Sequence, residues 1–529
     1  MLSHIARDKK TTFLLIIILL VAGVAQSQNM FSFPYYGDAE GGHLANAWAL
    51  DTLGDLSPYT YAYENPPLGS VFLSIWSNLS GGNTSFGFSL NSGRVFMLGL
   101  HIITVALIFS IAHRVSENRF AGMLAALVFA FSPLVTTLQR RILLDNIMIV
   151  WLLLAMWFIV GSNRKLNHYF ASAIAFSLAV LTKGGAIFFL PIIFLTIRNQ
   201  AHTFHRRFAT NLWFVMSGLV ILLFPLYAFM REELFPEGWF LGGDFPHVSL
   251  LERIADRGPE SGWLLNIGVG VRNSFDLWTD VQNLMADPII IYGGLISLLF
   301  IAVLAIDNKK LRPLFAMNIG NIAYLIFAGQ INNTDVVSML AFFAINIGVL
   351  IYLATDMVTS FLSFLEAPVI RYGLAALTPL VLLYPFYAFY SGRTEIYTIN
   401  QVEGQLQAID WVNNNIPDDS IVVTDNFAFI ELREDLPNIH DYWKVDTDPD
   451  IKFTLLADDP CNIDFMISTP QVISDIEAFN LDLMRRTFED SELLLTFPNN
   501  GWPVEIRQIN HTNCESSGIA RQFEESGRS

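Results

Sequence analysis

A short acidic stretch near the N-terminus holds the side chains best suited to chemistry. Asp38 and Glu40 lie within residues 37–43, which follow the first apolar segment. Transfer of a group from a phosphate carrier to a hydroxyl requires a base that takes the hydroxyl proton, whereas phosphate leaves without an acid. Asp38 and Glu40 are our candidates for this base. The alternative is that both only cap the following helix, where acids are favoured.

The same stretch also raises the question of a metal. Glu40 and His43 are three residues apart, so one helix face could offer a metal two ligands. The sequence identifies no third ligand, and it therefore leaves a divalent metal open.

Four further charged residues stand at the ends of apolar segments: Arg140, Arg141, Asp145 and Lys183. Ionisable groups at membrane depth are costly and usually face a cavity or a partner. Arginine or lysine there could neutralise a lipid-linked phosphate and stabilise the charge that builds on it. Alternatively, the cations extend to the headgroups. We expect Asp145 to pair with a neighbouring arginine or to line the cavity; a purely structural ion pair is the other interpretation.

Residues 231–285 form a second polar segment in which aromatic and polar side chains alternate. It contains Glu233, His247 and Arg272. Such a segment could be a lid over a sugar, because aromatic rings stack on sugar faces and mobile loops exclude water. Aromatic residues near a membrane are more often an interfacial belt.

The elements that must position these residues are membrane-spanning helices. Of the 529 residues, 53% are hydrophobic and 15% charged, outside the range of ordinary soluble domains. About eleven apolar runs are long enough to cross the hydrocarbon by the usual length criterion. We predict spans at 11–27, 94–113, 119–138, 142–161, 168–183, 184–198, 208–230, 286–305, 313–330, 335–355 and 368–390, with 28–93 and 231–285 as external loops.

The distribution of lysine and arginine predicts the orientation. These residues recur at every second connection, beginning with Arg7, Lys9 and Lys10, and they are retained on the cytoplasmic side. The N-terminus is therefore expected inside a multi-pass protein of the plasma membrane, with residues 392–529 outside. The first segment also fits a secretory signal peptide, and in either case residue 30 onward lies outside.

We predict two domains, a membrane domain at 1–391 and a soluble α/β domain at 392–529. The soluble part carries the whole formal net charge of −17, since it has 26 acidic and 9 basic residues. This charge argues against a nucleic-acid partner. We expect a helix at 399–413 and strands at 420–424, 463–468, 493–497 and 504–509. Cys461 and Cys514 both fall here, where a disulfide is permitted, and the sequence leaves their pairing open.

The first external loop resembles that of GT-C glycosyltransferases of the protein O-mannosyltransferase and lipid A aminoarabinose transferase type. The resemblance is carried by GDAEGGHLANAWAL at 37–50 and by LSPYTYAYENPPLG at 56–69. Four signposts follow in the family's order: SGR at 92–94, FSP at 131–133, RRILLD at 140–145 and LTKG at 181–184. The match covers residues 30–200 well and the remainder in outline.

The resemblance implies a mainly α, GT-C-like membrane domain that uses a polyprenyl-phosphate sugar as donor. It also implies that the aspartate of an Asp-Glu pair is the catalytic carboxylate. Here Ala39 interrupts the pair, and we favour Asp38 over Glu40. The expected substrate-binding residues are His43, Tyr61, Arg140, Arg141, Asp145, Lys183, His247 and Arg272.

The sequence therefore predicts an inverting transfer of a monosaccharide to an acceptor hydroxyl of a protein, lipid or polysaccharide. A secondary transporter is the alternative, although no internal repeat is visible. An oligosaccharyltransferase of the same superfold is disfavoured because its Trp-Trp-Asp-Tyr-Gly signature is absent. A non-enzymatic sensor with an exported domain is a further alternative, but it would not need the acidic first loop.

Overall fold

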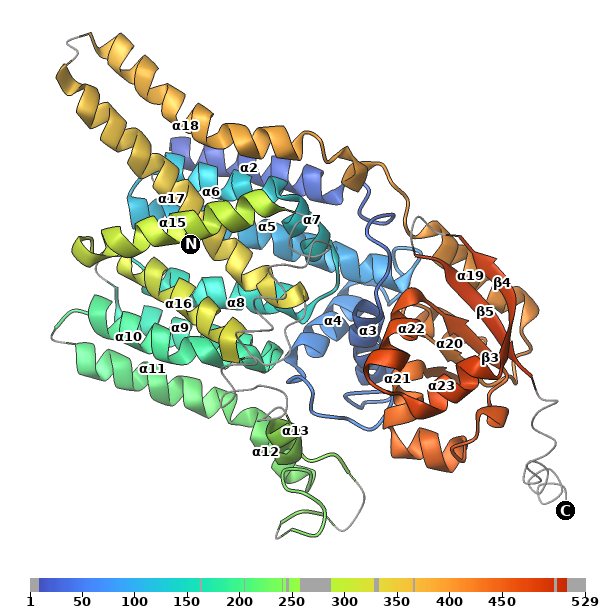
Figure 1. The fold of residues 1–529 in the computed structure, drawn as a ribbon. Coiled ribbons are helices and arrows are strands. Elements are labelled where there is room, and N and C mark those ends of the chain that lie inside the picture. Colours follow the sequence, from blue (N-terminus) through green and yellow to red (C-terminus); the bar gives the residue numbers. More distant parts are fainter. Residues whose placement is uncertain are drawn as a thin grey trace, which may run out of the picture. The chain divides into compact units, whose positions relative to one another are not determined.

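The computed structural model describes residues 9–161, 164–203, 205–239, 241–243, 247–256, 287–327, 333–364, 367–498 and 502–510. The chain divides into two compact units (Figure 1). The first consists of Met1–Gln28, Ala62–Gly69 and Met97–Ile396, and the second of Asn29–Tyr61, Ser70–Phe96 and Tyr397–Ser529. Most of the first external loop therefore belongs to the same unit as the acidic tail.

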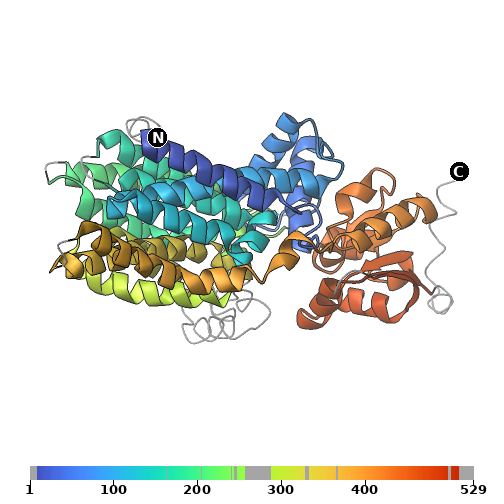
Figure 2. The same ribbon diagram turned by 90° about the horizontal axis from the view of Figure 1, so that it is seen from above.

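The first unit is a bundle of apolar helices. Its helices are α2 (Lys9–Ser27), the greater part of α5 (Ser89–Ser116), α6 (Arg119–Phe131), α7 (Pro133–Arg140), α8 (Leu144–Ile159), α9 (Leu166–Thr182), η1 (Gly184–Phe189), α10 (Leu190–Gln200), α11 (Arg206–Ile221), α12 (Leu223–Met230), α13 (Leu250–Asp256), α15 (Pro288–Asp307), α16 (Arg312–Phe327), η3 (Asn333–Val336), α17 (Val337–Phe361), η4 (Leu362–Phe364) and α18 (Pro368–Tyr390). Figure 2 shows dark-blue α2 running along this unit, where it packs against α6.

Each predicted span coincides with a helix or with two consecutive helices of the structure. Within the described residues, six helices are long and apolar enough to cross a membrane, or seven if α6 and α7, bent by 67°, form one span. The bend has a local cause. Pro133 lacks an N–H and excludes helical geometry from the residue before it, while the Ser132 hydroxyl caps α7 by accepting the Val135 N–H at 3.3 Å.

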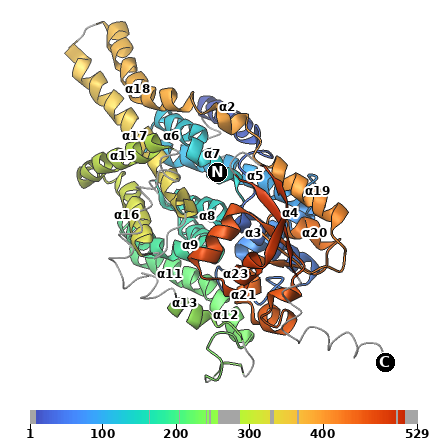
Figure 3. The ribbon, with the colours of Figure 1, turned by 45° about the vertical axis from the view of Figure 1, so that its right-hand side comes forward.

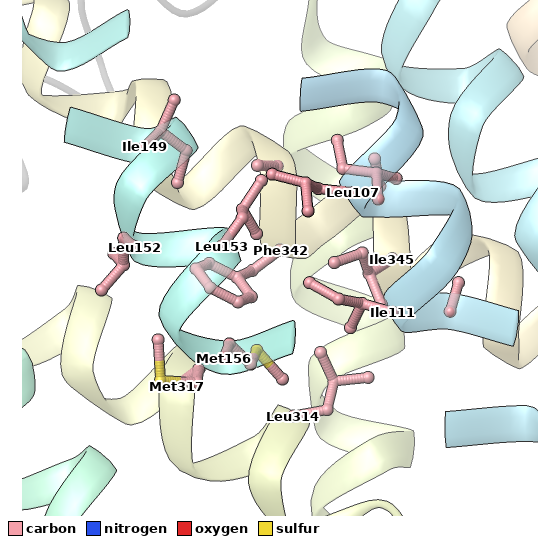
Figure 4. Packing of buried hydrophobic residues seen from close by; sticks show 14 of the residues in the cluster. Leu107, Ile111, Ile149, Leu152, Leu153, Met156, Leu314, Met317, Phe342 and Ile345 are labelled. Carbon is pink, nitrogen blue, oxygen red and sulfur yellow. The ribbon is translucent and has the colours of Figure 1, made fainter. Parts of the chain in front are cut away.

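The core of the first unit forms around α17. Every residue from 337 to 349 is buried, which is typical of a helix surrounded by other helices. Phe342 and Ile345 of α17 lie among Leu107 of α5 and Met156 of α8 (Figure 4). Close packing also depends on Gly348, because a Cβ there would lie 2.5 Å from the Ala125 nitrogen of α6.

The second unit contains a five-stranded mixed sheet. Its elements are α3 (Asp38–Thr52), the greater part of α4 (Leu68–Ser80), η5 (Thr394–Tyr397), α19 (Glu403–Asn415), β1 (Val422–Thr424), α20 (Phe429–Arg433), β2 (Ile439–Asp441), α21 (Tyr442–Thr447), η6 (Asp450–Leu455), η7 (Pro460–Asn462), β3 (Phe465–Ser468), α22 (Pro470–Ala478), α23 (Asp482–Glu489), β4 (Ser491–Phe497) and β5 (Val504–Ile509).

The strand order is β2-β1-β3-β5-β4, with β1 parallel to β2 and β3, and β5 antiparallel to β3 and β4. α19 packs against β4 and β5, and α22 packs against β3 (Figure 1). α20 packs against α3, and both helices are labelled in Figure 3.

The expected fold class, a mainly α membrane domain with a C-terminal α/β part, is confirmed. The predicted tail helix and the four predicted strands are present as α19, β1, β3, β4 and β5. Strand β2 was not predicted, because three residues are too few to show an alternating pattern. Cys461 is disulfide-bonded, and the chain's other cysteine, Cys514, lies outside the described residues.

Candidate active site

The two candidate bases sit in the first turn of α3 but have different surroundings. Glu40 caps the start of α3 by accepting the Gly37 N–H at 3.2 Å, which is the carboxylate half of a capping box. Its oxygens also accept from Arg94, at 3.3 Å from Nη2 and 3.4 Å from Nε, and both side chains are almost fully buried. A buried charge that is paired in this way is a structural element. Glu40 therefore matches the capping alternative.

Asp38 is only partly buried and is held by the tail. Its Oδ1 accepts the backbone N–H of Asn426 at 3.1 Å and the Asn426 Nδ2–H at 2.9 Å. Burial raises the pKa of Asp38, while the two hydrogen bonds from Asn426 lower it because they favour the charged form. Asp38 is thus the carboxylate of the pair that hydrogen-bond donors orient, and within the described part of the chain no lysine or arginine forms an ion pair with it.

Two further carboxyls gather at the same place because of the sheet topology. Asp425 follows β1, Asp441 ends β2 and Thr469 follows β3. Strands β1, β2 and β3 are parallel, so their carboxyl ends meet at one edge of the sheet. We call Asp38, Asp425 and Asp441 the acid cluster.

The negative charge of Asp38 raises the pKa of the other two members of the acid cluster. Burial, and next the negative charge of Asp38, hold the pKa of Asp425 well above its usual range. The same two causes raise the pKa of Asp441 to about 8. Asp425 is fixed in place, since its Oδ2 accepts from the Thr469 hydroxyl at 2.7 Å and its Oδ1 from the Phe427 N–H at 3.2 Å. Asp441 can therefore take up and release a proton near pH 8.

The sequence reasoning missed Asp425 and Asn426. The signal was present, because polar residues directly after a buried strand often lie at a functional edge of a sheet. However, the residues after β1, β2 and β3 meet at one edge only because these strands are parallel, and this pairing could not be predicted without β2. Among the described residues, no group of three or more His, Cys, Asp or Glu side chains could hold a metal ion.

The first unit contains a separate charged group around Lys183, the residue that follows α9. Its Nζ lies 2.8 Å from both oxygens of Asp145 in α8 and 2.7 Å from Oδ1 of Asp335 in η3. The Tyr324 hydroxyl donates to the same Asp335 oxygen at 2.6 Å. The partner of Asp145 is thus a lysine rather than a neighbouring arginine, and an ion pair is the other interpretation that the sequence leaves open. Asp335 and Tyr324 were not predicted.

Arg140 and Arg141, which end α7, differ sharply. The Arg140 guanidinium is buried and donates to the carbonyl oxygens of Gln26 at 3.1 Å, Gln28 at 2.7 Å and Ile396 at 3.0 Å. It therefore satisfies carbonyls at the end of α2, which have no partners within that helix. Arg141, the next residue, is only half-buried.

The other predicted substrate-binding residues are dispersed. His43 lies half-buried in α3, and Tyr61 lies in the loop before α4. The His247 ring bonds the carbonyl oxygen of Phe235 at 2.9 Å within the second polar segment. In the same segment Glu233 accepts from the Tyr63 hydroxyl. Arg272 lies outside the described residues.

The sequence of this chain was compared with those of known protein families and of curated proteins. Residues 10–233 match the sequence profile of the family described as Dolichyl-phosphate-mannose-protein mannosyltransferase. No curated protein matches the chain significantly.

Solved structures show a shared fold over nearly the whole chain. The oligosaccharyltransferase AglB from Archaeoglobus fulgidus, solved with an inhibitory peptide and a dolichol-phosphate, is 12% identical with a TM-score of 0.55, covering 94% of this chain and 74% of that one. ArnT from Cupriavidus metallidurans, solved with undecaprenyl phosphate, is 13% identical with a TM-score of 0.54, covering 93% of this chain and 97% of that one. These proteins and the apolar helices indicate a multi-pass membrane protein. The chain thus resembles this mannosyltransferase family over residues 10–233 and shares the fold of AglB and ArnT over nearly its whole length.

Proposed function

We propose that this protein is an inverting glycosyltransferase that moves a monosaccharide from a polyprenyl-phosphate carrier to an acceptor hydroxyl on the outer face of the membrane. The observation that carries the proposal is the difference between the two first-turn acids of α3. Glu40 is committed to Arg94, whereas Asp38 is oriented by two donors on one oxygen. The family match and the neighbours solved with polyprenyl phosphates support the donor class.

The reaction is a single displacement. Asp38 takes the proton of the acceptor hydroxyl while the hydroxyl oxygen attacks the anomeric carbon and the bond to the phosphate breaks. Lys183 and Arg141 stabilise the charge on the departing polyprenyl phosphate. For this step the phosphate replaces one carboxylate partner of Lys183, and Asp335 is our candidate because it makes the single contact.

The proposal is tested by incubating the purified protein in detergent with radiolabelled polyprenyl-phosphate monosaccharides and following release of the label. We expect Asp38→Asn to lower kcat by roughly 100- to 10,000-fold, the range of general-base catalysis. Asp51→Asn, a change in the last turn of the same helix α3, is the matched control and should retain wild-type turnover.

Glu40→Gln separates structure from chemistry. It leaves Arg94 buried without a charged partner, so we expect a lower Tm together with near-normal kcat per folded molecule. Wild-type turnover in Asp38→Asn contradicts the assignment of the base. Donor that crosses vesicles without losing its sugar supports the transporter alternative instead.

A further inference from the structure

The tail reaches the proposed base through one short loop. Residues 425–427, here named the β1 loop, follow β1 and run across the first turn of α3. Asn426 donates twice to the same oxygen of Asp38, from its backbone N–H at 3.1 Å and from Nδ2 at 2.9 Å. Two donors on one carboxylate oxygen restrict rotation of the carboxylate, so its direction is set by the tail.

The contact between the β1 loop and α3 requires a glycine. A Cβ on Gly41 would lie 2.0 Å from the carbonyl oxygen of Asn426 and 2.3 Å from its carbonyl carbon, closer than real Cβ atoms come. A Cβ on the next residue, Gly42, would lie 3.6 Å from Nδ2 of Asn426, an ordinary contact. The two backbones therefore touch at Gly41.

The β1 loop is itself anchored to the sheet. Asp425 accepts from the Thr469 hydroxyl after β3 and from the Phe427 N–H within the loop. These bonds hold the loop at the edge where the parallel strands β1 and β3 end. The carboxyl ends of parallel strands are a common place for functional groups.

We propose that Asn426 is a positioning residue for the sugar transfer: it points the carboxylate of Asp38 at the acceptor hydroxyl, and the tail thereby completes the catalytic centre that the first loop begins. The inference rests on the proposed function, in which Asp38 is the base. It adds a residue about 390 positions away in sequence and from the other part of the same compact unit.

The charges around Asp38 make the role measurable. Asp425 in the β1 loop, Asp441 at the end of β2, Asp475 in α22 and Tyr442 in α21 interact electrostatically with Asp38. Asp475 raises the pKa of Asp38, whereas the bonds from Asn426 lower it. Loss of the amide donor therefore raises the pKa of Asp38 further. Because the base must be ionised, the acid limb of the kcat/KM profile should move to higher pH.

The first experiment compares Asn426→Ala and the isosteric Asn426→Asp with wild type in the full-length protein. We expect kcat to fall about 10- to 100-fold in both, the loss typical of a misdirected catalytic group, with KM for the donor changed less than about twofold. Asn414→Ala, which removes an exposed amide of α19 in the same unit, is the matched control. A purely structural role would lower Tm without moving the acid limb.

The second experiment displaces the β1 loop without touching a polar group. Gly41→Ala forces the Asn426 backbone to move, so it should reproduce the lower kcat and the shifted acid limb of Asn426→Ala. Gly42→Ala adds the same methyl group to the same helix turn and should behave as wild type. Equal behaviour of the two alanine variants contradicts the inference.

A measurement that does not depend on turnover separates the two proposals. The infrared carboxylic C=O band of Asp38, identified by its loss in Asp38→Asn, is titrated in wild type and in Asn426→Ala. Wild type that consumes no donor overturns the proposed function, while a raised titration point in Asn426→Ala still supports the action of Asn426 on Asp38. An unmoved titration point overturns the inference, whatever the activity.

Discussion

Asp441 shows how one residue of the acid cluster couples the stability of the tail to pH. Its carboxyl is buried at the end of β2, accepts the Trp443 N–H at 3.2 Å and interacts electrostatically with Asp38. Burial raises the pKa of Asp441 from 3.8 to about 8. The folded protein therefore binds a proton that the unfolded chain releases at lower pH.

The sign of the resulting pH dependence follows from proton linkage. Between about pH 4 and pH 8 the folded state holds the Asp441 proton and the unfolded state does not, so stability falls as pH rises through this window. Asp441→Asn keeps an acceptor oxygen for Trp443 and stays neutral. We expect it to be more stable than wild type at pH 8, by on the order of a few kcal/mol, and similar at pH 4.

Thermal melting of the purified protein at the two pH values checks this prediction. Asp410→Asn, an exposed change on α19, serves as the control and should melt like wild type at both. A decline in Tm from pH 4 to pH 8 that is as steep in Asp441→Asn as in wild type would show that other groups dominate.

At the same scale, the sequence could identify the acids but not choose between them. Asp38 and Glu40 are two residues apart and share a helix turn, so local patterns treat them alike. Their roles diverge through Arg94 and Asn426, which the fold brings in from 54 and 388 residues away. The sequence likewise showed Arg140 as a cation at the end of an apolar segment. It did not show that the carbonyl oxygens at the end of α2 would be its hydrogen-bond partners.

Among the elements, the interface between α16 and α17 depends on polar pairs inside an apolar bundle. The amides of Asn318 and Asn346 bond reciprocally, with N···O distances of 3.3 and 3.0 Å, and both are buried. The Ser338 hydroxyl of α17 donates to Asn321 of α16 at 2.7 Å. Such hydrogen bonds hold helices together in membranes, where apolar contact gives little net drive.

We expect Asn346→Leu to lower the stability of the bundle by about 1 kcal/mol and to leave the Asn318 amide short of a partner. The double variant Asn318→Leu/Asn346→Leu should recover part of that loss, because no buried amide is then unsatisfied. Detergent-solubilised melting curves of the two single variants and the double variant give the coupling energy. Strictly additive losses would mean that the two amides do not act as a pair.

Elements were predictable to the extent that composition alone defines them. Apolar runs located the helices because the hydrocarbon demands about 20 apolar residues per crossing. The interruption at Ser132 and Pro133 was readable as a motif, yet its 67° bend depends on how α7 packs. Strand β2 exists because it pairs with β1, a tertiary cause that a three-residue window cannot contain.

At the scale of the whole molecule, the proposed mechanism assigns roles to two charged groups that belong to different compact units. Asp38 lies in the second unit with the tail, and Lys183 lies in the first with Asp145 and Asp335. The sequence predicted that an acid and a cation of this kind serve one reaction. Whether Asp38 and Lys183 act in the same reaction step can be tested by measuring kcat/KM.

A double-variant cycle makes the test. Asp38→Asn removes the base, and Lys183→Gln removes the positive charge while keeping a donor for Asp145. Each change should lower kcat/KM by roughly 100-fold or more, the scale of a lost base or of a lost donor to the developing charge. If both residues stabilise one transition state, the double variant should lose much less than the product of the two single losses, because groups that act as a unit are not additive.

The matched control combines Asp38→Asn with Lys310→Met, which removes an exposed lysine paired with Glu117 in the first unit. That pair has no expected part in the reaction, so the control double variant should match Asp38→Asn alone. If the loss of kcat/KM in the Asp38→Asn/Lys183→Gln protein equals the product of the two single losses, Asp38 and Lys183 do not stabilise the same transition state. Sugar transfer would then need a different cation, and Arg141, half-buried at the end of α7, is the first to examine by the same cycle.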